Sequence, residues 1–173
     1  MISPTYKVHL YTEKGENVEI ERKFIPTQIP DNLHRYEKKE VMQGYISSDP
    51  ELRLRHFGNK YIFTFKNGSY LAREEFEIEI SKEQFENLWK LVSGNIIKKD
   101  RYYIPLEKGL IAELDIYHEH LNGLITVEVE FDSEDGAKAF VPPDWFGEDV
   151  TYDKRYSNIN LSQGPPPSLI KDD

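Results

Sequence analysis

The chain has 173 residues, a length typical of one domain, and its 31 acidic and 22 basic residues give a formal net charge of −9. That charge argues against general nucleic-acid binding, and the absence of cysteine excludes disulfides and thiolate metal sites. No apolar run is long enough to span a membrane, and the first residues, MISPTYKVHLYTEKGE, lack the plan of a signal peptide. We therefore expect a cytoplasmic protein without a membrane or nucleic-acid partner, either a monomer or a homodimer.

Short segments with alternating polar and apolar residues run along the chain, a pattern typical of β-strands. The first is NVEIERKF at 17–24, where Glu19, Glu21 and Lys23 share one face. Further strands are expected at 40–47, 51–57, 61–66, 72–80, 96–104, 111–117 and 125–131. In several of them the charges on one face have a single sign, as in the pairs Arg53 and Arg55, Lys99 and Arg101, Glu113 and Asp115, and Glu128 and Glu130.

Helices are expected between the strands. Ser81 and Gln84 have the spacing of a capping box, and Phe85, Leu88, Trp89 and Val92 then fall on one helical face. A second helix is expected near Ser133, a short one within 31–40, and a last one from Thr151 with Tyr152, Tyr156 and Ile159 on one side.

Seven or eight such strands, mostly joined as hairpins, favour a mainly β (α+β) fold built on a closed antiparallel barrel with helices packed outside. In the ordinary interpretation the apolar faces fill the barrel and the charges are solvated. In the inverted interpretation the charges line a wet interior, and the apolar faces lie beneath the helices. The apolar helix stripes and the single-sign charge pairs favour the inverted interpretation.

The inverted interior would hold two sets of charges. Oxygen ligands suit Mg²⁺ or Mn²⁺, and the carboxylates on these faces are Glu19, Glu21, Glu75, Glu77, Asp115, Glu128 and Glu130. Arginine and lysine bind phosphate oxygens, and the cations on these faces are Lys23, Arg53, Arg55, Lys66, Arg73, Lys99 and Arg101. Together they predict a site for a metal–polyphosphate complex.

With these residues assembled, the sequence resembles the triphosphate tunnel metalloenzymes, also called the CYTH superfamily. The N-terminal signature of that family is matched by EIERK at 19–23, and the match continues through RLR, TFK, REEFEIEI, KDR, ELDIY and VEVEF to VTYDKRYSN at 150–158. On this resemblance, residues 18–162 form the tunnel domain, 1–17 an N-terminal extension and 163–173 a Pro-rich tail.

The resemblance implies an eight-stranded antiparallel tunnel and metal-dependent chemistry on a triphosphate. It implies metal binding by Glu19, Glu21, Glu128 and Glu130, assisted by Glu77 and Asp115, and catalytic roles for Glu19, Glu21, Lys23 and Glu130. The phosphates would be bound by Lys23, Arg53, Arg55, Lys66, Arg73, Lys99 and Arg101, joined by Lys154 or Arg155.

Hydrolysis of inorganic tripolyphosphate is the expected reaction, with nucleoside triphosphates as poorer substrates, because the sequence shows no glycine-rich loop or base-reading pocket. A class IV adenylate cyclase and a thiamine triphosphatase are alternatives within the same superfamily. A non-catalytic polyphosphate- or nucleotide-binding module is an alternative of another class.

Overall fold

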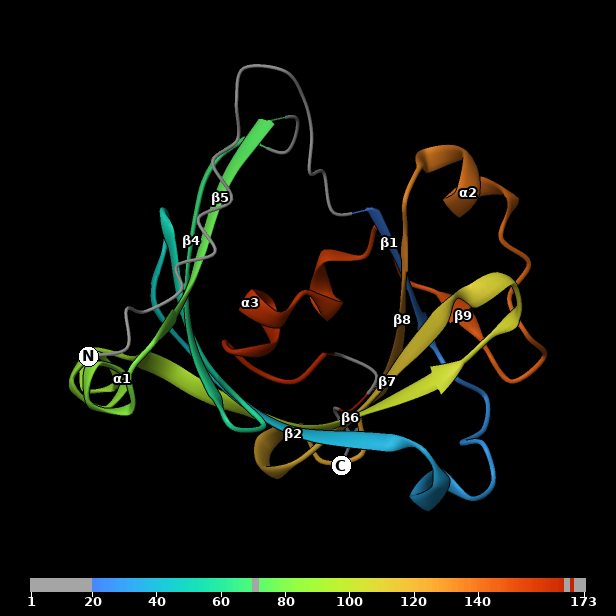
Figure 1. Ribbon diagram of the computed structural model, residues 1–173, viewed down its shortest axis with the longest axis horizontal. Helices are drawn as coiled ribbons and strands as arrows, with labels where there is room; N and C mark the ends of the chain where they lie inside the picture. The colour runs from blue at the N-terminus through green and yellow to red at the C-terminus, as the bar shows by residue number, and fades with distance from the viewer. Residues whose placement is uncertain (1–19, 70–71, 167–168, 170–173) are drawn as a thin grey trace, which may run out of the picture.

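The computed structural model describes residues 20–69, 72–166 and 169. Its main feature is one antiparallel sheet of nine strands in the order β5-β4-β3-β2-β6-β7-β8-β1-β9. The strands are β1 (Ile20–Ile25), β2 (Glu37–Ser48), β3 (Glu51–Phe57), β4 (Lys60–Ser69), β5 (Ala72–Ile80), β6 (Ser93–Pro105), β7 (Ile111–Tyr117), β8 (Ile125–Phe131) and β9 (Glu148–Asp149). The sheet curves strongly, so that one of its faces is concave (Figure 1).

The helical elements are short. They are η1 (Leu33–Arg35), α1 (Lys82–Trp89), η2 (Glu107–Gly109), η3 (Glu119–Leu121), α2 (Glu134–Ala139), η4 (Lys154–Tyr156) and α3 (Asn158–Leu161). The predicted capping box is confirmed, because Gln84 N donates to Ser81 Oγ and Ser81 N donates to the Gln84 side chain. The helix expected at Ser133 is also present, with that residue as its N-cap. None of the helices in the described residues has the length and apolar character needed to cross a bilayer.

The expectation of a closed barrel of eight strands is wrong. The sheet has nine strands, and within the described residues its two end strands, β5 and β9, do not pair with each other. The short strand β9 pairs with β1 through Phe24↔Asp149 and Ile25↔Glu148. It therefore uses part of the β1 edge that a closing strand would need.

The convex face of the sheet is apolar and is covered from outside, as the inverted interpretation predicts. Phe85 of α1 packs on Tyr61, with ring centroids 4.9 Å apart, and on Trp89 of its own helix. On the other half of the sheet, Phe24 contacts Phe146 at 4.9 Å, while Leu114, Val127 and Val129 are fully buried. This packing leaves the concave face for the charged residues.

The last helical segment does not lie outside with the other helices. Elements η4 and α3 occupy the concave side of the sheet (Figure 1), where Tyr156 and Leu161 belong to one buried cluster with Tyr45, Ile97 and Tyr117. At this end of the concave face the strand residues are apolar or aromatic, so they need a cover that excludes water.

The single helix expected from Thr151 is two short elements instead. Ser157 separates η4 from α3, because its backbone is extended and its side chain accepts from Asn160 N as the N-cap of α3. Tyr152 precedes both elements and is 96% exposed, so it does not share a packed face with Tyr156.

Candidate active site

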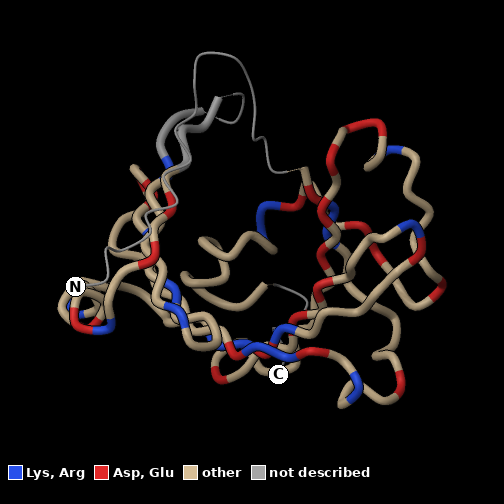
Figure 2. Tube along the Cα trace, viewed as in Figure 1, with Lys and Arg blue, Asp and Glu red and all other residues tan. Residues whose placement is uncertain are grey.

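Strand register brings the predicted charges together on the concave face. Across β1, β8, β7 and β6 the directly opposite pairs are Glu21↔Glu130, Lys23↔Glu128, Glu113↔Glu128 and Arg101↔Asp115. Across β2, β3, β4 and β5 they are Gln43↔Arg55, Tyr45↔Arg53, Arg53↔Thr64 and Thr64↔Glu77. Acidic and basic positions are interspersed along these strands, whereas α3 carries no charge (Figure 2).

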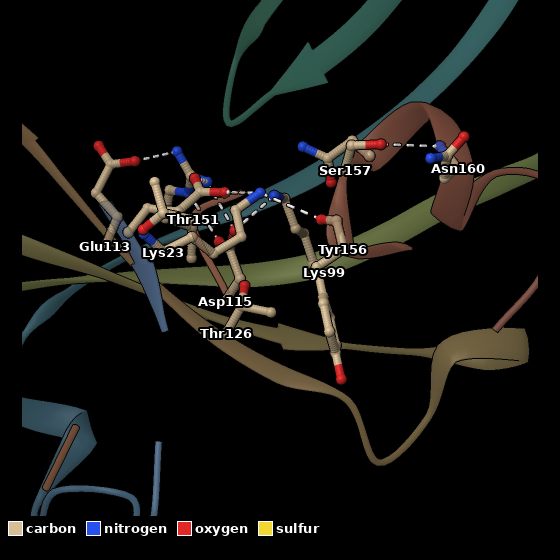
Figure 3. A network of polar contacts seen from close by, with 12 residues as sticks. Lys23, Lys99, Glu113, Asp115, Thr126, Thr151, Tyr156, Ser157 and Asn160 are labelled. Carbon is tan, nitrogen blue, oxygen red and sulfur yellow. Dashed lines mark hydrogen bonds and ion pairs between the residues drawn. The ribbon is translucent and has the colours of Figure 1, made fainter. Parts of the chain in front are cut away.

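The first half of the site is a buried network of ion pairs around Arg101. Figure 3 shows this region, with Lys23, Lys99, Glu113 and Asp115 labelled. Asp115 accepts from Arg101 Nε and from another nitrogen of the same guanidinium, both at 2.7 Å, and from Lys99 Nζ at 2.5 Å. Arg101 also donates to Glu128 Oε2 at 2.7 Å and to Glu113. Asp115 has no exposed surface, so its charge depends on these donors.

Lys23 connects this network to the C-terminal segment. Its ammonium lies 2.8 Å from Glu128 Oε1 and donates to the Tyr156 carbonyl at 3.2 Å. Its backbone N–H donates to Thr151 Oγ1, and its carbonyl accepts from Val150 N. The segment that includes η4 therefore fixes the position of a predicted catalytic side chain.

Burial and neighbouring charge set the pKa values of this half. Burial would lower the pKa of Lys23, but Glu128, Tyr117 and Glu21 together outweigh it and the pKa is raised. Burial opposes ionisation of Glu128 and Asp115 in the same way, yet the adjacent cations hold both pKa values below their ordinary range. Lys99 is different, because burial dominates and lowers its pKa to about 8 despite Asp115.

The second half of the site, on β2 to β5, is richer in unneutralised positive charge. Arg55 donates from Nε to Gln43 Oε1 at 3.1 Å and makes no ion pair with a carboxylate of the described residues. Burial lowers its pKa to about 10, and the neighbouring Arg53 and Arg101 contribute to that shift. Such a cation gains strongly from an anionic ligand.

Arg53 lies beside Arg55 and is 8% exposed. It donates to Thr64 Oγ1 at 3.2 Å, and Glu77 Oε2 and Glu51 Oε1 lie 3.6 Å and 3.9 Å from its guanidinium. Within the described part of the chain, the buried Nε of Arg53 has no hydrogen-bond partner. Gln43 completes this row by donating to the Tyr45 hydroxyl at 3.2 Å. Arg53 Nε is thus a donor available to a bound oxygen.

Several predicted residues lie at the margins of this arrangement. Glu130 and Glu77 are exposed, Glu21 and Lys66 are half-buried, and Lys154 and Arg155 are exposed on η4, where Arg155 pairs with Asp153. Arg73 lies in β5, but its side chain and that of Glu75 are outside the described part, and Glu19 lies wholly outside it. The predicted N-terminal extension, 1–17, also falls outside the described residues.

Glu113 was missing from the predicted site, although it alternates with Asp115 on β7. The structure places it opposite Glu128 and in contact with Arg101. Burial raises its pKa, the nearby Glu128 and Glu130 add to this, and together they outweigh Arg101. The alternation of Glu113 with Asp115 was the signal that could have identified it.

The donor set fits a hard divalent cation, although the carboxylates are now engaged with lysine and arginine. No three acidic or histidine side chains within the described ranges form a ready metal cluster. However, Glu21 lies opposite Glu130, and Glu113 lies opposite Glu128. Like charges placed directly across a ladder repel, and a divalent cation among their oxygens would relieve that repulsion.

Comparison with known proteins identifies the family of the chain. The model of the CYTH domain family matches residues 17–156. The chain is 47% identical over 152 residues to the inorganic triphosphatase of Nitrosomonas europaea, covering 86% of this chain and 99% of that protein. It is 37% identical over 153 residues to the inorganic triphosphatase of Acetivibrio thermocellus, covering 85% and 94%.

Solved structures show the same fold. The crystal structure of the inorganic triphosphatase NE1496 superimposes with a TM-score of 0.69 at 44% identity, covering 88% of this chain and 99% of that one. HpAC1 from Hippeastrum, described as a putative adenylyl cyclase with a dominant triphosphatase activity, is 18% identical with a TM-score of 0.54, covering 69% and 82%, and supports the fold alone. On this evidence, the chain belongs to the CYTH domain family.

Proposed function

We propose that this protein is a metal-dependent triphosphatase that hydrolyses inorganic tripolyphosphate, with nucleoside triphosphates as poorer substrates. The observation that carries the proposal is the group of cations on the concave face: among the described residues, Arg55 forms no ion pair with a carboxylate, and the buried Nε of Arg53 has no hydrogen-bond partner. A linear polyanion supplies the missing oxygens. The two relatives named above as inorganic triphosphatases support the same substrate.

The cations bind and orient the substrate in this proposal. Arg53, Arg55 and Lys66 bind phosphate oxygens from β3 and β4, while Lys23, Lys99 and Arg101 bind them from β1 and β6. Arg73, Lys154 and Arg155 extend this set at the margins. Because transfer of a phosphoryl group depends mainly on alignment and charge neutralisation, the chain needs no nucleophilic side chain of its own.

Glu21, Glu128 and Glu130 hold Mg²⁺ or Mn²⁺ in this proposal, with Glu19 and Glu77 assisting. Such an ion, when bound, neutralises phosphate oxygens and lowers the pKa of a coordinated water. We assign Asp115 a supporting role, because it has no exposed surface and its two oxygens accept three hydrogen bonds from Lys99 and Arg101. Asp115 thereby fixes the positions of these two cations.

Phosphate release tests the proposal directly, with tripolyphosphate, ATP and thiamine triphosphate offered in Mg²⁺, in Mn²⁺ or in chelator. Metal-dependent release, fastest from tripolyphosphate and lost in Glu130→Ala, is the expected result. The matched control is Glu134→Ala, since Glu134 is an exposed carboxylate on α2 paired with Lys138.

Two other outcomes would contradict the proposal. Cyclic AMP formed from ATP, without phosphate release from tripolyphosphate, would establish a cyclase. Binding of tripolyphosphate without turnover in any metal would establish a binding module.

A further inference from the structure

Arg101 cannot bind a phosphate through two of its N–H groups while it keeps all of its present contacts. Its Nε and one terminal nitrogen are used by Asp115, that terminal nitrogen also reaches Glu128, and the other terminal nitrogen is used by Glu113. Every nitrogen of the guanidinium therefore already donates to a carboxylate. These contacts use four of the five N–H groups, so a triphosphate that binds Arg101 through two N–H groups has to replace one of the three acids.

The three acids differ in what their release would cost. Asp115 is fully buried and also holds Lys99, and Glu128 is buried and also holds Lys23. Glu113 pairs with Arg101 alone among the described residues, and its side chain is the most exposed of the three, at 17% against 7% and 0%. Exchange of Glu113 leaves no other cation without its anion.

A released Glu113 is not left in a neutral setting. Its directly opposite neighbour on β8 is Glu128, two residues from Glu130 on the same face of that strand. Without Arg101 this carboxylate faces like charge in a half-buried place, which is costly unless a cation arrives with the phosphate. The exchange therefore favours a triphosphate that brings its divalent cation with it.

We propose that Glu113 is a positioning residue that acts as an internal competitor of the substrate: it occupies Arg101 in the ligand-free protein and yields it to a triphosphate oxygen. This inference rests on the proposed function. It explains why a carboxylate lies within a group of phosphate-binding cations. It also predicts that the metal–triphosphate complex binds far more tightly than the triphosphate alone.

Calorimetric titration with tripolyphosphate in excess EDTA tests the competition, because no turnover is expected there. In Glu113→Gln, Arg101 loses its competing anion, and Kd is expected to fall about tenfold below the wild-type value, the effect of one charge-assisted contact. The matched control is Glu37→Gln. Glu37 is exposed and pairs with Lys39, and it lies in the same cross-strand row through Tyr103.

An unchanged or weaker affinity in Glu113→Gln would overturn the inference, and so would an equal gain in Glu37→Gln, which would indicate a general charge effect. If Glu113→Gln does not fold, Glu113→Asp retains the charge and withdraws it by one methylene. A smaller gain in the same direction is then expected, and no gain is a contradiction. Failure of the proposed function is distinguishable, because wild-type protein would then release no phosphate in Mg²⁺ or Mn²⁺.

Discussion

Arg101 and Asp115 face each other across β6 and β7 as a two-pronged ion pair, with both hydrogen bonds at 2.7 Å. Lys99 approaches the same carboxylate at 2.5 Å. Two cations thus share one fully buried anion, which makes Asp115 the electrostatic centre of the first half of the site.

Asp115→Asn should therefore destabilise the fold by about 3–5 kcal/mol, because it leaves two buried cations without their anion. Urea denaturation measures the change. Glu119→Gln is the control, since Glu119 pairs with Lys98 at 2.7 Å in an exposed place and its change should cost little stability. Equal losses in the two variants would show that Asp115 is not the centre described above.

Arg55→Ala should separate function from stability. Its guanidinium is held by Gln43 rather than by a carboxylate of the described residues, so its removal should leave the melting temperature unchanged or raise it. The KM for tripolyphosphate should rise roughly 10- to 100-fold, as expected for lost charge-assisted contacts. Arg35→Ala, on the exposed element η1, serves as the control. A large loss of stability with an unchanged KM would refute this role of Arg55.

Acid should weaken the fold through Glu128. Its folded-state pKa is well below the ordinary value of a glutamate because Lys23 and Arg101 outweigh the effect of burial. The stability that ionised Glu128 contributes to the fold is thus fully present above about pH 4.5. It is lost as the pH falls toward the pKa of Glu128 in the folded protein. Melting temperatures in EDTA should drop between about pH 5 and pH 3. The drop should be shallower in Glu128→Gln, and parallel curves would contradict this assignment.

Gly147→Ala should destabilise the edge of the sheet next to the site. A Cβ at this position would lie 2.4 Å from the Ile25 carbonyl oxygen, so backbone has to move, at a cost of about 1–3 kcal/mol. At Gly164 an added Cβ meets nothing within 4 Å, which makes Gly164→Ala the comparison. Thermal unfolding of both variants is the measurement, and indistinguishable melting temperatures would be evidence against the close approach.

Alternation along single strands predicted the faces of the sheet well. Leu54 is buried on the convex face while Arg53 and Arg55 lie on the concave one, as their spacing requires. The capping box at Ser81 is equally local, because both of its bonds join residues three apart. Such features are set by neighbours in the sequence, so the sequence alone is sufficient to predict them.

Closure of the sheet and the place of the last helix depend on distant contacts instead. Part of the β1 edge is taken by β9, a strand of two residues with no periodic signal of its own. The apolar residues of the last helical segment predict that it packs against the sheet, but they do not predict against which face. The structure shows that α3 lies on the concave face, where the Tyr117 hydroxyl of β7 donates to the Asn158 side chain at 3.4 Å.

The position of β1 has a consequence for the order of folding. This strand comes first among the described elements, yet its partners in the described sheet are β8 and β9, which are made after all the other strands of that sheet. Strands β2 to β5 can pair as hairpins while the chain is still growing, since each follows its partner directly. Glu21 and Lys23 cannot take their places in the sheet until β8 and β9 have been made. A ribosome-bound nascent protein therefore carries its arginine-rich half before it carries a complete site.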